Sequence, residues 1–366
     1  DANLILTGSD ASRNLKISPA GVGYATITVT VSDGVNSANY VINYAGSVAS
    51  STPSTSRFHT GKSDASTAIA IDSTYMLVAD DEDQTIRVYD RINSGLPVTQ
   101  FDFTSSLGLS GGGEVDIEGA TRVGNRIYWQ GSHGNNSGGN DNPNRERVFA
   151  TDLSGTGAAT TLTFAGFYPF LEDDLVAWDS NNGHGLGANA LGLAASVSGV
   201  PEAAGGFNIE GLSMAPGSST TAYIGFRAPL MLPGARTKAL IVPVTNYPNL
   251  LGAASGTASF GAPIQLSLGG LGIRSIECSA DGCLIIAGSA DGAGNFKLFT
   301  WSGNAADAPQ ERATALTVTV GQESFESIVE LPVGSFLGAN GDALTVQLLR
   351  DNGDTPWYGD GIIAKD

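Results

Sequence analysis

The chain has 366 residues, with 36 acidic and 18 basic side chains and a formal net charge of −18. This balance argues against nucleic acid or an anionic membrane surface as a partner, because both are bound by basic patches. No apolar run is long enough to insert into a membrane, and the 49 glycines among short β-branched and aromatic runs favour an all-β fold.

Residues 1–47 are predicted to form a small domain of their own. Residues 25–34 alternate apolar and polar side chains and run into an Asp-Gly turn, and residues 39–44 return, which predicts a β-hairpin. The hairpin resembles the end of a bacterial immunoglobulin-like or cadherin-like surface repeat. Such a sandwich needs about seven strands and only about four fit here, so we expect a β-sandwich fragment.

Residues 48–56 are rich in Ser, Thr and Pro and are predicted to be a linker. The chain opens within a strand pattern, and no signal peptide is visible. We therefore expect a secreted or cell-surface protein cut from a longer precursor, with neighbouring domains of that precursor as partners.

A short strand pattern occurs five times in residues 57–366, starting near residues 64, 116, 208, 273 and 325. The common spacing of about fifty residues is the size of a propeller blade. Each copy is followed by a second apolar strand, over residues 75–79, 126–129, 222–226, 284–287 and 344–348. Radial repetition of such units predicts a five-bladed β-propeller, with six blades as the alternative if the longer gap hides one.

The longer gap contains an insertion, residues 168–206. Leu171 to Trp178 have helical spacing, and Leu186 to Val197 are a Gly/Ala-rich apolar run that fits a loose helix. The insertion is either a lid over the channel mouth or a surface decoration. The last blade lacks an outer strand, and we expect residues 57–61 to supply it and close the ring.

Aligning the five copies places one residue of each at an equivalent position: Ser66, Glu118, Glu210, Arg274 and Glu326. The start of a first strand lies beside the end of the second, because the two are antiparallel neighbours. The second strands end at further polar residues, among them Asp80, Asp81, Ser132, His133, Arg227, Ser289, Arg350 and Asp351. We expect these side chains to converge on one mouth of the channel; the alternative is solvated strand ends without a role.

Three glutamates around a narrow channel raise one another's pKa unless a cation neutralises them. Arg274 is one such cation, and a divalent metal on Glu118, Glu210 and Glu326 is the other. Oxygen ligands favour Ca²⁺, with Mg²⁺ or Mn²⁺ as alternatives. Two acidic loops are separate candidate calcium sites, one with Asp80 and Asp81 and one with Asp351 and Asp354. A metal-free ring of ion pairs that pins the blades together remains the alternative.

Two functions fit this site. The first is metal-dependent hydrolysis of an anionic, phosphate-ester-like substrate, in which a glutamate is the base, His133 is the acid, and Arg227 and Arg274 hold the anion. The second is a non-catalytic, calcium-stabilised binding or adhesion module for an extracellular ligand. A serine-centred triad is not expected, because Ser132 and His133 are adjacent and would point to opposite faces of a strand.

Cys278 and Cys283 flank a Ser-Ala-Asp-Gly turn in the fourth copy. The two cysteines would lie close enough across a hairpin to form a disulfide, which agrees with an extracellular protein. The alternative is a pair of free thiols in a cytosolic protein.

Several stretches together resemble a known family. They are Glu210-Gly211-Leu212, residues 224–230, Gly272-Ile273-Arg274, Gly131-Ser132-His133 and residues 144–149. Over roughly residues 60–366 the chain is similar to the bacterial domain of unknown function 3616. This resemblance implies a propeller-like fold and brings no established reaction. A weaker similarity to phytase-like and esterase-like propellers concerns the fold alone.

Overall fold

The computed structural model describes residues 3–21, 23–46, 56–231, 236–251, 256–292, 294–313, 316, 324–331 and 345–353. The chain divides into two compact units, Asp1–Arg57 with Gly353–Asp366, and Phe58–Asn352. Among the described residues, no helix has the length and apolar character needed to cross a bilayer.

The N-terminal unit contains two small antiparallel sheets. One pairs β1 (Leu4–Thr7) with β2 (Asn14–Ile17), and the other pairs β3 (Gly23–Ser32) with β4 (Ser37–Gly46). The second is the predicted hairpin, and its register places Ile27 opposite Ile42. Between residues 3 and 46, no side chain whose burial the structure describes is buried, so these side chains form no core of their own.

The larger unit is built from antiparallel sheets whose strands follow chain order. The first sheet comprises β5 (Ala65–Ala70), β6 (Tyr75–Asp80), β7 (Thr85–Asp90) and β8 (Thr99–Asp102). The second comprises β9 (Ile117–Val123), β10 (Arg126–Gly131), β11 (Val148–Ser154) and β12 (Thr161–Tyr168). The third comprises β13 (Asn208–Met214), β14 (Ala222–Ala228), β15 (Ala239–Val244) and β16 (Ile264–Leu266). The fourth comprises β17 (Gly272–Ser279), β18 (Gly282–Gly288), β19 (Phe296–Trp301) and β20 (Gln310–Glu311).

A further sheet pairs β21 (Ser324–Glu330) with β22 (Gln347–Asp351). The propeller arrangement is confirmed, but the described residues form four four-stranded blades, not the five predicted. The segments that would carry outer strands after β22 lie outside the described residues.

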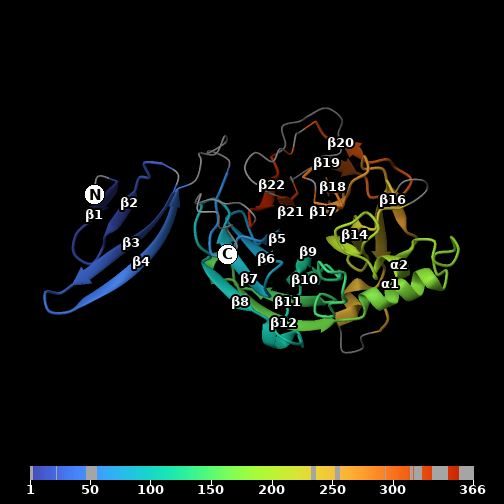
Figure 1. Ribbon diagram of the computed structural model, residues 1–366, viewed down its shortest axis with the longest axis horizontal. Coiled ribbons are helices and arrows are strands. Elements are labelled where there is room, and N and C mark those ends of the chain that lie inside the picture. Colours follow the sequence, from blue (N-terminus) through green and yellow to red (C-terminus); the bar gives the residue numbers. More distant parts are fainter. Residues whose placement is uncertain are drawn as a thin grey trace. The chain divides into compact units, whose positions relative to one another are not determined.

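The first strands stand side by side around a common centre. Strand β21 lies beside both β17 and β5, so the last sheet meets the first. Figure 1 shows β5, β9, β17 and β21 inside and β8, β12, β16 and β20 at the periphery. Side-chain hydroxyls link neighbouring first strands: Ser213 accepts a hydrogen bond from the Cys278 N–H (2.9 Å), and Ser327 accepts one from the Ala68 N–H (3.1 Å).

Apolar side chains fill the spaces between successive sheets and hold the ring together. The largest cluster packs the second sheet and the insertion against the third, around Tyr128, Leu171, Phe226 and Tyr247. These four side chains are 5% exposed or less. The first strands are therefore held rigidly, which is what positions a site at their starts.

The insertion between β12 and β13 contains α1 (Leu171–Ser180), as predicted, and a single turn, α2 (Leu193–Ser196). The expected loose helix over residues 186–197 is limited to that turn, because Gly187 and Gly192 take left-handed conformations (φ 113° and 72°). Three short 3₁₀ segments complete the regular structure: Thr104–Ser106, Gly157–Ala159 and Tyr247–Leu251.

In the described part of the chain, residues 58–60, which were predicted to belong to the outer strand of the last sheet, bind the first blade. Phe58 accepts a hydrogen bond from the Gly95 N–H, and the Thr60 N–H donates to the Gly95 carbonyl, which joins this segment to the first blade.

Candidate metal centre

Every first strand carries a β-bulge at the position that the repeat alignment identified. In the third blade, for example, Ile209 pairs with Phe226 and Gly211 with Gly225, so Glu210 has no partner on β14. The residues skipped in this way are Ser66, Glu118, Glu210, Arg274 and Glu326. Because a bulge bends the strand and re-aims the extra side chain, the same local device turns all five side chains out of the regular alternation.

Arg274 joins glutamates from two other sheets. Its Nη1 donates to Oε1 of Glu210 (2.9 Å), and its Nη2 donates to Oε1 of Glu326 and to Oγ of Ser324 (3.0 Å). Arg227, the extra residue of a bulge on β14, donates from Nη1 to the same oxygen of Glu210 (3.1 Å). Only 2% of Glu210 and 5% of Glu326 is exposed, so these ion pairs are buried.

The negative charge of three carboxylates is nevertheless not fully offset by these arginines. One oxygen each of Glu118, Glu210 and Glu326 lie within 4.8 Å of one another. The Oε2 atoms of Glu210 and Glu326 are buried without a hydrogen-bond partner. Leaving a buried carboxylate oxygen unpaired is costly, so this arrangement fits a cation that would take those oxygens as ligands.

The pKa values express the same imbalance. Burial, followed by the charges of Glu210 and Asp116, raises the pKa of Glu118 well above its usual value. Burial also raises the pKa of Glu210 to about 7, although Arg274 and Arg227 oppose the shift. Burial alone would lower the pKa of Arg274, but Glu210 and Glu326 raise it overall, so this guanidinium stays charged.

The acidic groups continue toward the first blade. Carboxylate oxygens of Asp81, Asp116 and Glu118 form a second group within 4.8 Å, and those of Asp64, Asp81 and Glu82 form a third. Asp116 accepts hydrogen bonds from Ser132 Oγ and pairs with Arg145 (3.0 Å). Burial and the neighbouring carboxylates raise the pKa of Asp81 to about 10, so this carboxyl group is protonated at neutral pH.

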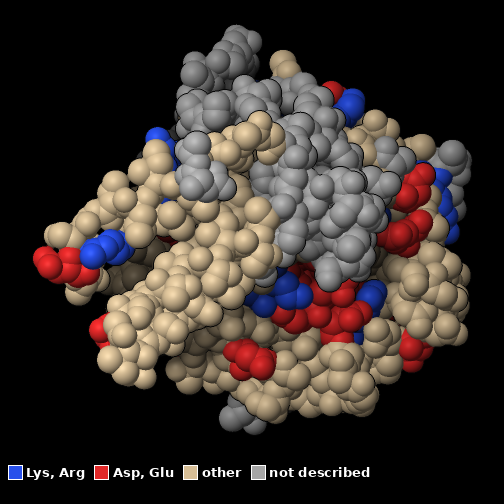
Figure 2. All heavy atoms as spheres, turned by 60° about the vertical axis from the view of Figure 1, so that its left-hand side comes forward, with Lys and Arg blue, Asp and Glu red and all other residues tan. Residues whose placement is uncertain are grey.

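The space-filling view agrees with this acidic character. On the face seen in Figure 2, Asp and Glu side chains gather in one patch with Lys or Arg side chains at its border. Basic side chains therefore border the acidic patch on this face.

Other predicted site residues lie outside the three groups. Asp80 pairs with Lys62 (3.5 Å), and burial raises its pKa to about 6. Asp351 contributes to the raised pKa of Asp81. Asp354 lies outside the described residues. His133 is 1% exposed, its Nδ1 lies 2.8 Å from the Gly131 carbonyl, and burial lowers its pKa to about 4; a neutral histidine in this position gives no support to its predicted role as an acid.

Residues that were not predicted also belong to this region: Asp64, Glu114, Asp116, Arg145 and Glu202. Asp116 and His133 both take left-handed backbone conformations (φ 57° and 56°), which non-glycine residues rarely adopt. Strain of this kind is concentrated at functional sites, but its position cannot be recognised in a single sequence.

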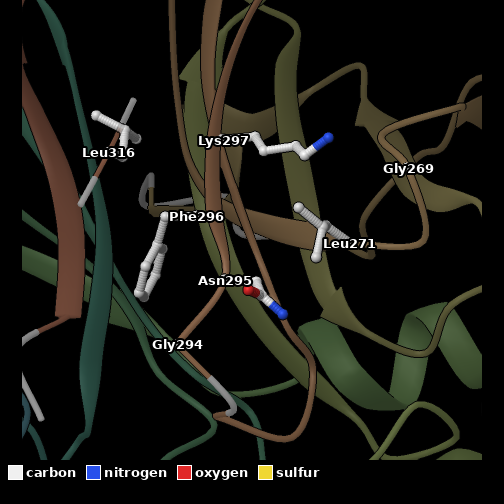
Figure 3. Close-up of a pocket in the computed structure, with 7 residues that line it drawn as sticks. All are labelled: Gly269, Leu271, Gly294, Asn295, Phe296, Lys297 and Leu316. Carbon is white, nitrogen blue, oxygen red and sulfur yellow. The ribbon is translucent and has the colours of Figure 1, made fainter. Parts of the chain in front are cut away.

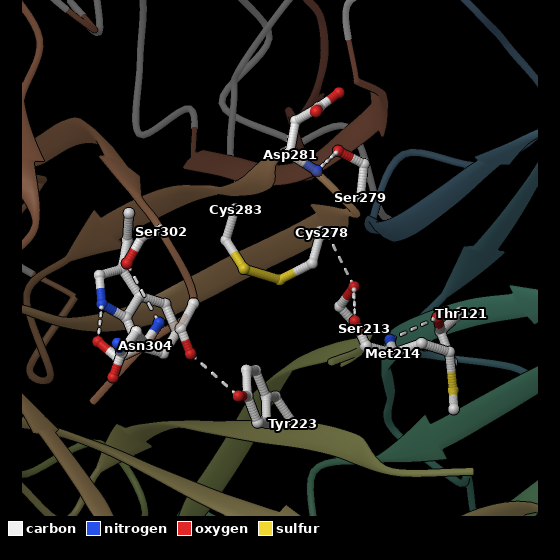
Figure 4. The surroundings of a disulfide bond; sticks show 12 residues. Thr121, Ser213, Met214, Tyr223, Cys278, Ser279, Asp281, Cys283, Ser302 and Asn304 are labelled. Carbon is white, nitrogen blue, oxygen red and sulfur yellow. Dashed lines mark hydrogen bonds between the residues drawn. A yellow bond between two sulfur atoms is a disulfide. The ribbon is translucent and has the colours of Figure 1, made fainter. Parts of the chain in front are cut away.

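A cavity lies away from these carboxylates. It has a volume of about 400 Å³ and is lined by Gly269, Leu271, Gly294, Asn295, Phe296, Lys297 and Leu316 (Figure 3). None of these residues belongs to the carboxylate groups. The predicted Cys278–Cys283 disulfide is confirmed; it links facing residues of β17 and β18 (Figure 4).

The region that contains Glu210, Arg227, Arg274 and Glu326 can be compared with known families. Residues 189–352 match the family "Protein of unknown function (DUF3616)". The family resemblance is thereby confirmed over this part of the chain. The DUF3616 match does not extend to residues 131–149, where the same resemblance was expected. Ion pairs within the DUF3616 region join three of its first strands, β13, β17 and β21.

No curated protein matches the chain. Among solved structures, the chain is similar to the glutaminyl cyclase of Myxococcus xanthus, with 10% identity and a TM-score of 0.39 over 76% of this chain and 85% of that chain. It is also similar to a DUF4623 family protein from Bacteroides eggerthii, with 10% identity and a TM-score of 0.31 over 83% and 71% of the two chains.

Proposed function

We propose that this protein binds a divalent cation at the starts of the first strands, through Glu118, Glu210 and Glu326. The observation that carries the proposal is the pair of buried, unpartnered Oε2 atoms on Glu210 and Glu326 beside a third carboxylate. Three carboxylates against Arg227 and Arg274 leave one negative charge uncompensated. Since the donors are all oxygens, Ca²⁺ fits best, with Mg²⁺ and Mn²⁺ as alternatives.

One candidate function for the loaded site is hydrolysis of an anionic, phosphate-ester-like substrate. It is favoured by the position of Asp81, whose carboxyl group lies in one group with Asp116 and Glu118 beside the proposed cation and could exchange a proton with a substrate there. Glu118 or Glu210 would then hold the cation or act as the base. Arg227 would contact the anion.

The second candidate is a non-catalytic binding or adhesion module. Glu210, Arg274 and Glu326 come from three different sheets, so the buried ion pairs already connect the ring, and a calcium ion would strengthen that connection. We further infer that β21 and β22 are the inner half of a fifth blade, because β21 carries the same bulge as the other first strands. The disulfide supports a secreted location.

Isothermal titration of EDTA-treated protein with Ca²⁺, Mg²⁺ and Mn²⁺ tests the cation site. We expect stoichiometric binding that Glu118→Gln weakens at least about tenfold, because ligand charge sets calcium affinity. Glu277→Gln is the matched control: Glu277 also lies in a first strand, burial raises its pKa to about 8, and it belongs to none of the carboxylate groups. Wild-type protein that binds none of the three ions, or equal binding by Glu118→Gln, would refute the site.

Turnover of p-nitrophenyl phosphate by the calcium-loaded protein separates the two candidate functions. Hydrolysis that is lost in Asp81→Asn while calcium binding persists would establish the enzyme. Stoichiometric calcium binding without turnover would favour the binding module.

A further inference from the structure

Arg227 has one hydrogen-bond donor that points toward an exposed partner. Its Nε donates to the Ala290 carbonyl (3.1 Å) and its Nη1 to buried Glu210 (3.1 Å), which fix the guanidinium plane. Its Nη2 donates to Oε1 of Glu202 (3.3 Å). The Arg227 side chain is 7% exposed, whereas that of Glu202 is 62% exposed. A held guanidinium thus presents its remaining edge to a solvated carboxylate.

Arg274 differs in this respect. Both of its Nη atoms are bonded to groups inside the ring, namely Glu210, Glu326 and Ser324. Displacing any of these groups would uncover a buried charge, which is strongly unfavourable. An incoming anion would therefore meet Arg227 rather than Arg274.

We propose that Nη2 of Arg227 is a subsite for a phosphate or carboxylate group of a small ligand, and that Glu202 occupies this subsite as an internal stand-in until the ligand displaces it. The inference rests on the proposed cation site. Arg227 lies close enough to Asp116 to lower that residue's pKa. An anion bound this close to the acidic groups is tolerated only after a cation has offset their charge.

Glu202 is well placed to be displaced. A half-exposed ion pair contributes little to stability, since solvent screens it and two side chains must be ordered to form it. The loop that carries Glu202 is fixed on both sides without it. Nδ2 of Asn135 donates to the carbonyls of Val197 and Gly199 (both 2.9 Å), and the Leu230 N–H donates to the Ala204 carbonyl (2.8 Å). Only the Glu202 side chain needs to move.

Titration of the calcium-loaded protein with monomethyl phosphate, and separately with acetate, tests the subsite at pH 7.5. Removing the competing carboxylate in Glu202→Gln should tighten binding of one or both anions about fivefold, the factor expected for an ion pair of this exposure. Arg227→Lys keeps the charge but loses the forked donors, and should weaken binding at least about tenfold. The matched control is Glu330→Gln, because Glu330 is an exposed glutamate (53%) paired with a partly buried arginine, Arg91 (10%), in the same unit.

The outcomes separate this inference from the cation site. If calcium binds, but the Glu202→Gln and Glu330→Gln variants bind each anion with the same affinity as one another, the subsite is refuted and the cation site stands. Anion binding that Arg227→Lys leaves unchanged, with its calcium affinity and melting temperature intact, also refutes the subsite. If calcium does not bind at all, the cation proposal fails first. Tighter phosphate than acetate binding in Glu202→Gln would identify a phosphate ligand, and the reverse a carboxylate.

Discussion

At the scale of single residues, the raised pKa values of Glu118 and Glu210 make cation binding depend on pH. A carboxyl group must release its proton before it can become a ligand, so affinity should rise as the pH passes the pKa of Glu210, about 7. Competition by that one proton predicts about tenfold tighter calcium binding at pH 8 than at pH 6. Titrations in buffers of different ionisation enthalpy would count the released protons. An affinity that is flat over this range, with no proton release, would contradict the assignment.

Sequence reasoning identified Glu118, Glu210, Arg274 and Glu326 because a repeat places equivalent residues at equivalent positions. It could not identify Glu202, since contact with Arg227 depends on the path of an insertion that has no counterpart in the other blades. The anion-binding role predicted for Arg274 stays a prediction. Both Nη atoms of that side chain bind partners that are distant in sequence, and a single sequence does not show which partners meet.

At the scale of the strand, the glycine after the bulged glutamate explains the recurring Glu-Gly pair. A Cβ on Gly211 would lie 2.8 Å from Cγ2 of Ile273 on the next first strand, and one on Gly119 would lie 2.8 Å from Cβ of Leu212. Gly211→Ala should therefore cost about 1–3 kcal/mol by overpacking. It should also weaken calcium binding, because Glu210 is the adjacent residue. Gly256→Ala, where an added Cβ meets nothing within 4 Å, is the control. Urea unfolding and calcium titration of both variants check this; equal stabilities would show that β13 can move away from β17.

Most inner strands were predictable because local signals agree there: alternating or continuous apolar residues, bounded by turns. The bulges that aim the site residues were not, because a bulge is a relation between two strands and leaves no mark in either one. The pairing of residues 58–60 with the first blade is another relation of this kind. In both cases the missing information is which backbone groups face each other.

At the scale of the whole molecule, the predicted ring is present, but its completeness differs from expectation. Period and composition identified the propeller, whereas the described residues complete four blades and the inner pair of one further sheet. The count depended on outer strands, which carry the weakest sequence signal because one edge faces solvent. The inner strands, packed on both sides, carry the strongest.

The stability of the metal-free ring should fall as the pH rises from 5 to 8. Burial raises the pKa of Glu210 to about 7 and that of Asp116 to about 6, so folding is favoured while these groups are protonated, and that contribution is lost as the pH rises through the folded-state pKa values. The shift of Glu210 alone corresponds to about 3 kcal/mol. Asp72 and Asp83, whose pKa values are lowered, lose their contribution only at more acidic pH, outside this window. The lowered pKa of His133, about 4, opposes the decline between pH 5 and about 6.5, because the unfolded histidine binds a proton there and the folded one does not. Saturating calcium should reduce the decline, because a bound cation favours the ionised carboxylates, whereas the part due to Glu277, which lies outside the carboxylate groups, should remain. Urea unfolding at pH 5, 6.5 and 8, with EDTA or with calcium, measures both effects. Metal-free protein that gains stability toward pH 8, or a decline that calcium leaves unchanged, would show that these carboxylates do not form the cation site.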